Sequence, residues 1–266
     1  MKKNRTILFL IVTVSVFFSS CQQVIQLDLD TSVPHLVIQG NVYDQAGPYK
    51  VKISKTVNFD AANIYPAVTN ATVTISDNAG LSEVLSQDTA GTYITSKLHG
   101  KVGRTYILTV NVDGKTYTAS STMPVPAEID SIYYKNSLFG GSQLIALDFI
   151  NPPNKENYYR IIHFINDKQA TGFSIFSKNT SQAEKTSYAF MSTNPRDTTT
   201  TPKLKKGDKV AVWLECIDKG VFEYFRTANS EGGQNASPAN PVSNISNGAL
   251  GYFSACSVRK RQIVFQ

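Results

Sequence analysis

Apolar and polar residues alternate along many short runs of this chain, which is the pattern of half-buried β-strands. Tyr49, Val51 and Ile53 alternate with polar neighbours, and Val73 and Ile75 do the same. β-branched and aromatic residues are abundant in these runs, and such side chains suit a pleated, half-buried surface. Other short strands are predicted at Leu36–Val42, Ser82–Ser86 and Thr92–Ser96. About seven strands at a spacing of roughly 8–12 residues predict an immunoglobulin-like β-sandwich over residues 34–122.

The sharpest local prediction is a hairpin at Asp113-Gly114. Asp-Gly between two alternating runs favours a two-residue type I′ turn. This turn sets the register, so that Val112 faces Lys115. The same register pairs Val110 with Tyr117 and Leu108 with Ala119. These four side chains and that of Tyr106 should then share the face that points to the core.

Two closely spaced prolines separate this region from the rest of the chain. Pro124 and Pro126 fix φ and favour extended backbone, so residues 123–127 are predicted to be a stiff linker. A second β-rich domain with one short helix is expected over residues 128–266. Its helix is predicted at Asp218–Ser230, with Asp218 as the N-cap. Its strands are expected at Ser131–Tyr134, Gln143–Ile150, Tyr158–Ile165, Phe173–Phe176 and Lys209–Ile217.

The N-terminus has the pattern of an export signal. Basic residues precede an apolar run of about a dozen residues, which is shorter than the roughly twenty that a membrane-spanning helix needs. The run ends at Phe18-Ser19-Ser20-Cys21, which resembles a relaxed bacterial lipobox. We therefore expect a lipoprotein signal peptide over residues 1–20, a lipid on Cys21 and a tether over 21–33. The alternative is an ordinary signal peptide with an incidental cysteine.

Charge and composition narrow the classes of partner. The formal net charge is +6, and half of it comes from three basic residues ahead of Cys21, where no acid stands. The remainder, about +3, is mild, and Arg259-Lys260-Arg261 is the densest basic run. A nucleic-acid-binding protein needs a clustered basic face, so no nucleic-acid partner is expected.

Three cysteines occur in the chain, and two remain after Cys21 is assigned to the lipid. Exported proteins live in surroundings that permit disulfides. Cys216 and Cys256 are therefore a candidate disulfide, and the alternative is that both are small buried hydrophobic residues. No second Cys or His stands at zinc-ligand spacing, and no calcium-loop pattern occurs, so no metal site or cofactor is predicted.

The residues give no reaction signature, and we do not expect an enzyme. No Gly-x-Ser-x-Gly elbow is present. His163 lies in an apolar strand, where a core histidine is the simpler interpretation than a catalytic base. Two pairs of adjacent tyrosines, Tyr133-Tyr134 and Tyr158-Tyr159, are the candidate ligand or partner surface, because one member of each pair faces away from the other. Ordinary cross-strand packing is the alternative.

The ordered blocks "NATVTISDNAG", "GRTYILTVNVDGKTYTASSTMPVPAEIDSIYY" and "NPVSNISNGALGYFSA", after the lipobox cysteine, resemble a Bacteroidetes lipoprotein family known as domain-of-unknown-function family 4249. The resemblance implies an outer-membrane lipoprotein, encoded beside TonB-dependent receptors of the SusC-like kind. An accessory role in nutrient or metal capture follows as an expectation, with the ligand unknown.

This resemblance brings no catalytic residues and no substrate. Acids that often follow the cysteine in surface-exported lipoproteins come late here, at Asp28 and Asp30. The face of the outer membrane therefore stays open between the cell surface and the periplasm. A structural or adhesive surface lipoprotein is the second hypothesis, and a hydrolase that uses His163 is the third.

Overall fold

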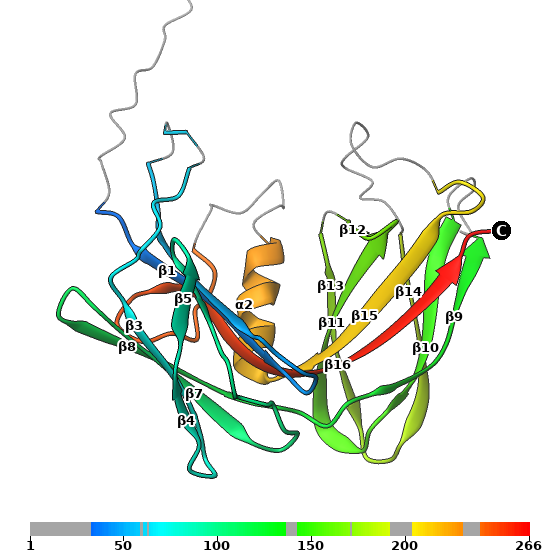
Figure 1. Ribbon diagram of the computed structural model, residues 1–266. Coiled ribbons are helices and arrows are strands. Elements are labelled where there is room, and N and C mark those ends of the chain that lie inside the picture. The colour runs from blue at the N-terminus through cyan, green and yellow to red at the C-terminus, as the bar shows by residue number, and fades with distance from the viewer. Residues whose placement is uncertain are drawn as a thin grey trace, which may run out of the picture. The chain divides into compact units, whose positions relative to one another are not determined.

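The computed structural model describes residues 33–58, 61–62, 64–136, 143–170, 172–191, 204–230 and 240–266. The signal peptide, Cys21 and nearly all of the expected tether lie outside these residues. Within them the chain is mostly β with one short helix, which confirms the fold class predicted from the sequence (Figure 1).

The strands fall into two groups along the chain. The first group is β1 (Leu36–Tyr43), β2 (Lys50–Lys55), β3 (Thr72–Asp77), β4 (Ser82–Val84), β5 (Ser86–Thr89), β6 (Thr92–Ile94), β7 (Thr105–Val112) and β8 (Lys115–Thr122). The second group is β9 (Glu128–Asn136), β10 (Gln143–Asn151), β11 (Asn154–Ile165), β12 (Lys168–Gln169), β13 (Ser174–Thr180), β14 (Glu184–Met191), β15 (Lys209–Ile217) and β16 (Leu250–Val264). The helix α2 (Lys219–Ser230) lies between β15 and β16.

The described strands form three sheets. The largest has the order β12-β11-β15-β16-β1-β2-β6-β5, with β13 also paired to β11. The others are β4-β3-β7-β8 and β14-β10-β9. The 15-residue strand β16 links the two groups, because its first half pairs in parallel with β1 and its second half pairs antiparallel with β15.

The first core lies between the sheet that contains β1, β2 and β6 and the sheet that contains β3, β7 and β8. Side chains from both sheets interdigitate there, as in a β-sandwich, and Ile38, Val51 and Tyr106 are fully buried. Residues from the end of the chain complete this core, namely Ile245, Ala249, Phe253 and Ala255. The expected domain of residues 34–122 therefore does not close by itself, and residues 34–266 form one compact unit.

The hairpin prediction is confirmed. Val112 pairs with Lys115, and the other predicted pairs follow in register. Asp113 and Gly114 have φ values of 51° and 72°, as a type I′ turn requires. The residues predicted to share the core face are buried or packed against the first core.

The second core lies between β9, β10 and β14 on one side and β11, β15 and β13 on the other. Leu147, Phe149 and Tyr159 are fully buried within it. The opposite face of β11, β13 and β16 is covered by α2, whose Val221 and Phe225 form a third apolar cluster. Asp218 caps the helix as predicted, because its Oδ1 accepts a hydrogen bond of 2.9 Å from the Val221 N–H.

Candidate functional site

The two cysteines expected as a candidate disulfide are buried free thiols in the structure. Cys216 pairs with Ser257 across β15 and β16, and its side chain belongs to the second core. Cys256 precedes Ser257, so its side chain points to the opposite face, into the cluster under α2. The disulfide prediction is therefore wrong here, because the thiols lie on opposite faces of one sheet.

The side chains of Tyr158 and Tyr159 are both buried, so this pair does not form the ligand or partner surface that was predicted for it. Tyr159 is fully buried in the second core, where its hydroxyl donates a hydrogen bond to Asn151 Oδ1. Tyr158 faces the other way and packs against Phe222 of α2, with ring centroids 4.8 Å apart. The two side chains do point to opposite faces, but β11 is covered on both of them.

Of the pair on β9, Tyr133 reaches the surface, whereas the hydroxyl of Tyr134 does not. Tyr133 is 38% exposed, and its hydroxyl donates a hydrogen bond of 3.2 Å to Asp148 Oδ1 on the neighbouring strand. Tyr134 points inward, and its ring meets Phe265 edge to face at 4.7 Å. Burial and, to a smaller extent, the Asp208 carboxylate raise the pKa of Tyr134 to about 12. Its buried hydroxyl has no hydrogen-bond partner among the described residues.

Both of these tyrosines line a pocket of about 510 Å³ between β9 and the end of β16. Its walls are mainly apolar and aromatic, and they comprise Ile132, Tyr133, Tyr134, Ile263, Val264, Phe265 and Gln266. A concave apolar surface with a few polar groups is typical of a binding site. The unpartnered hydroxyl of Tyr134 belongs to a residue of this wall, and a buried unpaired donor costs about 1–3 kcal/mol. The pocket between β9 and β16 is thus the candidate functional site.

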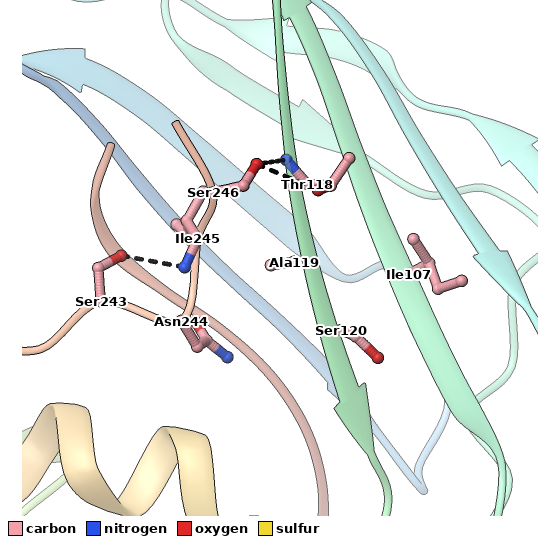
Figure 2. A pocket seen from close by; sticks show the side chains of 8 residues that line it. All are labelled: Ile107, Thr118, Ala119, Ser120, Ser243, Asn244, Ile245 and Ser246. Carbon is pink, nitrogen blue, oxygen red and sulfur yellow. Dashed lines mark hydrogen bonds between the residues drawn. The ribbon is translucent and has the colours of Figure 1, made fainter. Parts of the chain in front are cut away.

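A second pocket, of about 380 Å³, lies beside the edge strand β8 and is lined by residues from β7, β8 and the segment 243–246 (Figure 2). The N–H of Ser246 donates to the Thr118 carbonyl at 2.8 Å, and the Thr118 N–H donates to Ser246 Oγ at 2.8 Å. Ile245 forms a bridge with Ala119. The segment 243–246 therefore behaves as a short added strand, which occupies much of this edge.

A polar cluster surrounds Asp148 on the outer face of β10. Ser187 donates to Asp148 Oδ1 at 2.7 Å, and Lys185 lies 3.4 Å from Asp148 Oδ2 and 2.7 Å from Asp130. The Ser187 hydroxyl, with smaller contributions from Lys185 and Tyr133 and against the effect of burial, lowers the pKa of Asp148. The carboxylate is held in its ionised, accepting form. These contacts join β10 to its two neighbours in the sheet, because Lys185 and Ser187 lie on β14 and Asp130 lies on β9.

His163, the residue of the hydrolase alternative, is 7% exposed on β11. Its ring lies beside Phe190, with centroids 5.2 Å apart. Nowhere in the parts of the chain that the structure describes do three or more His, Cys, Asp or Glu side chains group as they would around a metal ion.

A buried ion pair was missed from the sequence. Arg160 Nε lies 2.7 Å from Glu215 Oε2, and the two side chains are 10% and 1% exposed. The guanidinium also sits over the Phe225 ring of α2, at 4.1 Å from its centroid. One signal could have found it, because Arg160 and Glu215 each stand within an otherwise apolar strand, where a charge needs a partner.

No helix in the described residues combines the length and apolar character needed to span a membrane. A comparison with curated proteins found no match. One similar solved structure, titled "Cytokine receptor complex - Crystal form 1A", is 7% identical, with 86% of this chain and 95% of that chain covered. Its TM-score of 0.23 is too low to support an argument about fold or function.

A family model matches residues 23–262, which is nearly the whole chain from just after Cys21. The match includes the strands of both cores and most of β16. The chain therefore belongs to the family described as Domain of unknown function (DUF4249).

Proposed function

We propose that this chain is a lipid-anchored outer-membrane binding protein and that it serves as an accessory to a TonB-dependent receptor of the SusC-like kind in nutrient or metal capture. The observation that carries the proposal is the position of the lipobox. The family match begins at residue 23, two residues after the cysteine of Phe18-Ser19-Ser20-Cys21. A lipid on Cys21 would therefore stand directly before the family domain, as an anchor needs. More than one acyl chain gives stable membrane attachment, at about 0.8 kcal/mol for each buried CH₂ group.

The candidate site supports binding as the activity. Its walls are apolar and aromatic, and aromatic side chains are enriched at the centres of interfaces. The neighbouring polar groups, such as Asp148, are engaged with each other in hydrogen bonds and ion pairs. Such a surface holds a partner or ligand by contact area and a few hydrogen bonds.

The test is purification of the native protein from its own membranes, followed by mass spectrometry of the N-terminal peptide and of co-purifying proteins. We expect an acylated Cys21 at the N-terminus and a TonB-dependent receptor in the complex. The matched control is Cys21→Ala, which should lose the acyl group and leave the membrane fraction while the fold is unchanged.

Two outcomes would contradict the proposal. An unmodified Cys21 within an intact N-terminus would remove the anchor. An acylated chain that repeatedly purifies alone would refute the receptor and favour the structural or adhesive lipoprotein.

A further inference from the structure

The second half of β16 has one open edge. β1 pairs with β16 only as far as Tyr43 and Cys256, whereas β15 continues beside it to Val264. In an antiparallel pair, backbone groups point alternately to the partner strand and away from it. The Phe265 N–H donates to the Asp208 carbonyl at 2.8 Å, beside β15, so even-numbered residues direct their backbone groups to the open side.

The first of these even-numbered positions is already covered. The Val258 N–H donates to Asp44 Oδ1 at 2.8 Å, and the Val258 carbonyl accepts from Gln45 Nε2 at 3.2 Å. Beyond it, no strand pairs with the open side of Lys260 or Gln262 in the parts of the chain that the structure describes. The strands β16 and β9 lie next to each other (Figure 1), and Ile263 and Val264 of β16 line a pocket together with Tyr134 of β9. The backbone of β16 from Lys260 to Val264 is the open edge.

The candidate pocket adjoins the open edge. Ile263 and Phe265 line it from β16 and the residue that follows, and Tyr134 lines it from β9. A strand added beside β16 would direct every second side chain toward the layer of β9. One apolar side chain of that strand would then enter the pocket, while the backbone pairs with Lys260 and Gln262.

Basic side chains outnumber acidic ones around this edge, where Asp208 is the acidic residue near Tyr134. The charge of Arg259 is compensated by Asp44 and Glu128, at 2.8 and 2.7 Å. No salt bridge occurs in the described residues for Lys260 and Arg261 of β16, Lys135 of β9 or Lys209 of β15. The Lys260 ammonium lies over the Trp213 ring, 3.7 Å from its centroid, and Arg261 donates a hydrogen bond of 3.4 Å to the Ile129 carbonyl, but neither contact neutralises the charge. Complementary charge steers partners and suppresses wrong ones.

We propose that the open edge from Lys260 to Val264 receives an extended, acidic segment of a partner protein as an added strand, with one apolar side chain in the pocket between β9 and β16. Strand addition of this kind takes its affinity from main-chain hydrogen bonds and its specificity from side-chain pockets. The inference rests on the proposed binding function, but it does not depend on which receptor is the partner.

The test is fluorescence anisotropy with the purified full chain and a labelled ten-residue peptide in which Glu alternates with Val and one central residue is Phe. The decisive variant is Gln262→Pro, and Gln262→Ala is its matched control. The Gln262 N–H points away from β15, so proline removes an outward donor and leaves the internal ladder intact, as edge strands tolerate. We expect Gln262→Ala to bind like the wild type and Gln262→Pro to bind about tenfold more weakly or worse, the effect of losing hydrogen bonds worth about 1.4 kcal/mol.

A second variant keeps the proposal testable if Gln262→Pro does not fold. The double substitution Lys260→Glu and Arg261→Glu should weaken binding of the acidic peptide and should favour a peptide in which Lys replaces Glu. Binding of the acidic peptide to the wild type should also fall as salt rises, because exposed charges are screened.

Several results would overturn the proposal. One is no binding of the acidic peptide to the wild type, in which case the charged edge serves only to prevent strand-to-strand aggregation. Others are equal binding by Gln262→Pro and Gln262→Ala when both are folded, or no effect of the charge reversal. Failure of the receptor purification, with the peptide result positive, would refute the receptor and leave the edge proposal standing.

Discussion

Asp218 joins the edge of the first core to the helix that covers the second group of strands. Its Oδ1 caps α2 through the Val221 N–H at 2.9 Å. Its Oδ2 accepts hydrogen bonds from the Ser121 hydroxyl and, at 3.2 Å, from the Thr122 N–H at the end of β8. Replacing Asp218 by Ala therefore removes three hydrogen bonds from two distant segments at once.

The size of the effect follows from these contacts. Loss of a helix N-cap costs about 1 kcal/mol. A hydrogen bond to a charged group contributes about 1.5–3 kcal/mol. The carboxylate of Asp218 is only half-buried, so we take about 1 kcal/mol for each of its two bonds to β8. We expect Asp218→Ala to lower the free energy of unfolding by about 3 kcal/mol.

Urea unfolding followed by the fluorescence of Trp213, the chain's single tryptophan, measures this change. Asp88→Ala is the matched control, because Asp88 is exposed on β5 and should change stability by less than about 0.5 kcal/mol. Asp218→Asn keeps an oxygen for the cap and should fall between the two. A loss for Asp218→Ala no larger than that of the control would refute the assignment of Asp218 as the link.

Three further predictions concern buried polar groups. Arg160→Met or Glu215→Leu alone should destabilise the protein by about 3–5 kcal/mol, because each leaves a buried charge unpaired. The double variant should recover most of this loss. Urea unfolding measures the three free energies, and losses that simply add in the double variant would contradict the prediction. Because the pKa of Asp148 is lowered in the folded protein, its ionised carboxylate contributes its full stabilisation above the unfolded pKa of about 3.9, and this stabilisation is lost as pH falls through the folded pKa. Asp148→Asn should therefore flatten the dependence of the free energy of unfolding on pH below about pH 4. An unchanged pH dependence would be the contrary result. Burial raises the pKa of Cys216 to about 11, so Cys216 and the fully buried Cys256 should react with a thiol reagent only on unfolding. Rapid labelling of either residue in the native chain, distinguished from Cys21 by peptide mass spectrometry, would show that it is accessible.

Short sequence motifs correctly predicted a turn and a helix start, which depend on a few neighbouring residues. Asp113-Gly114 set the β7–β8 register, and Asp218 marked the start of α2. The longest strand, β16, was not predicted, although it joins both cores. Residues 253–258 are all buried because the sheet is covered on both faces there, so the strand has no apolar–polar alternation, and its small residues resemble a loop.

The sequence predicted one wall of the candidate site, the tyrosines of β9, and missed the other wall, from β16. The rule that adjacent tyrosines face opposite ways holds for Tyr158 and Tyr159, but it cannot say that α2 covers one face and the second core the other. Tyr133 and Tyr134 do line the pocket, yet its other wall comes from β16, about 130 residues later in the chain. The contact between β9 and β16 is a property of topology, which no local pattern encodes.

The place of β16 in the middle of the largest sheet has a consequence for how the protein is made. β1 is synthesised first but finds its parallel partner only among residues 250–256, and Phe253 fills the core beneath it. Until those residues are available, β1 has an unpaired edge and the first core lacks the Phe253 side chain. Such intermediates are prone to aggregate. We therefore expect the nascent chain to stay dependent on chaperones until its last strand emerges, and folding to be a late, nearly all-or-none event.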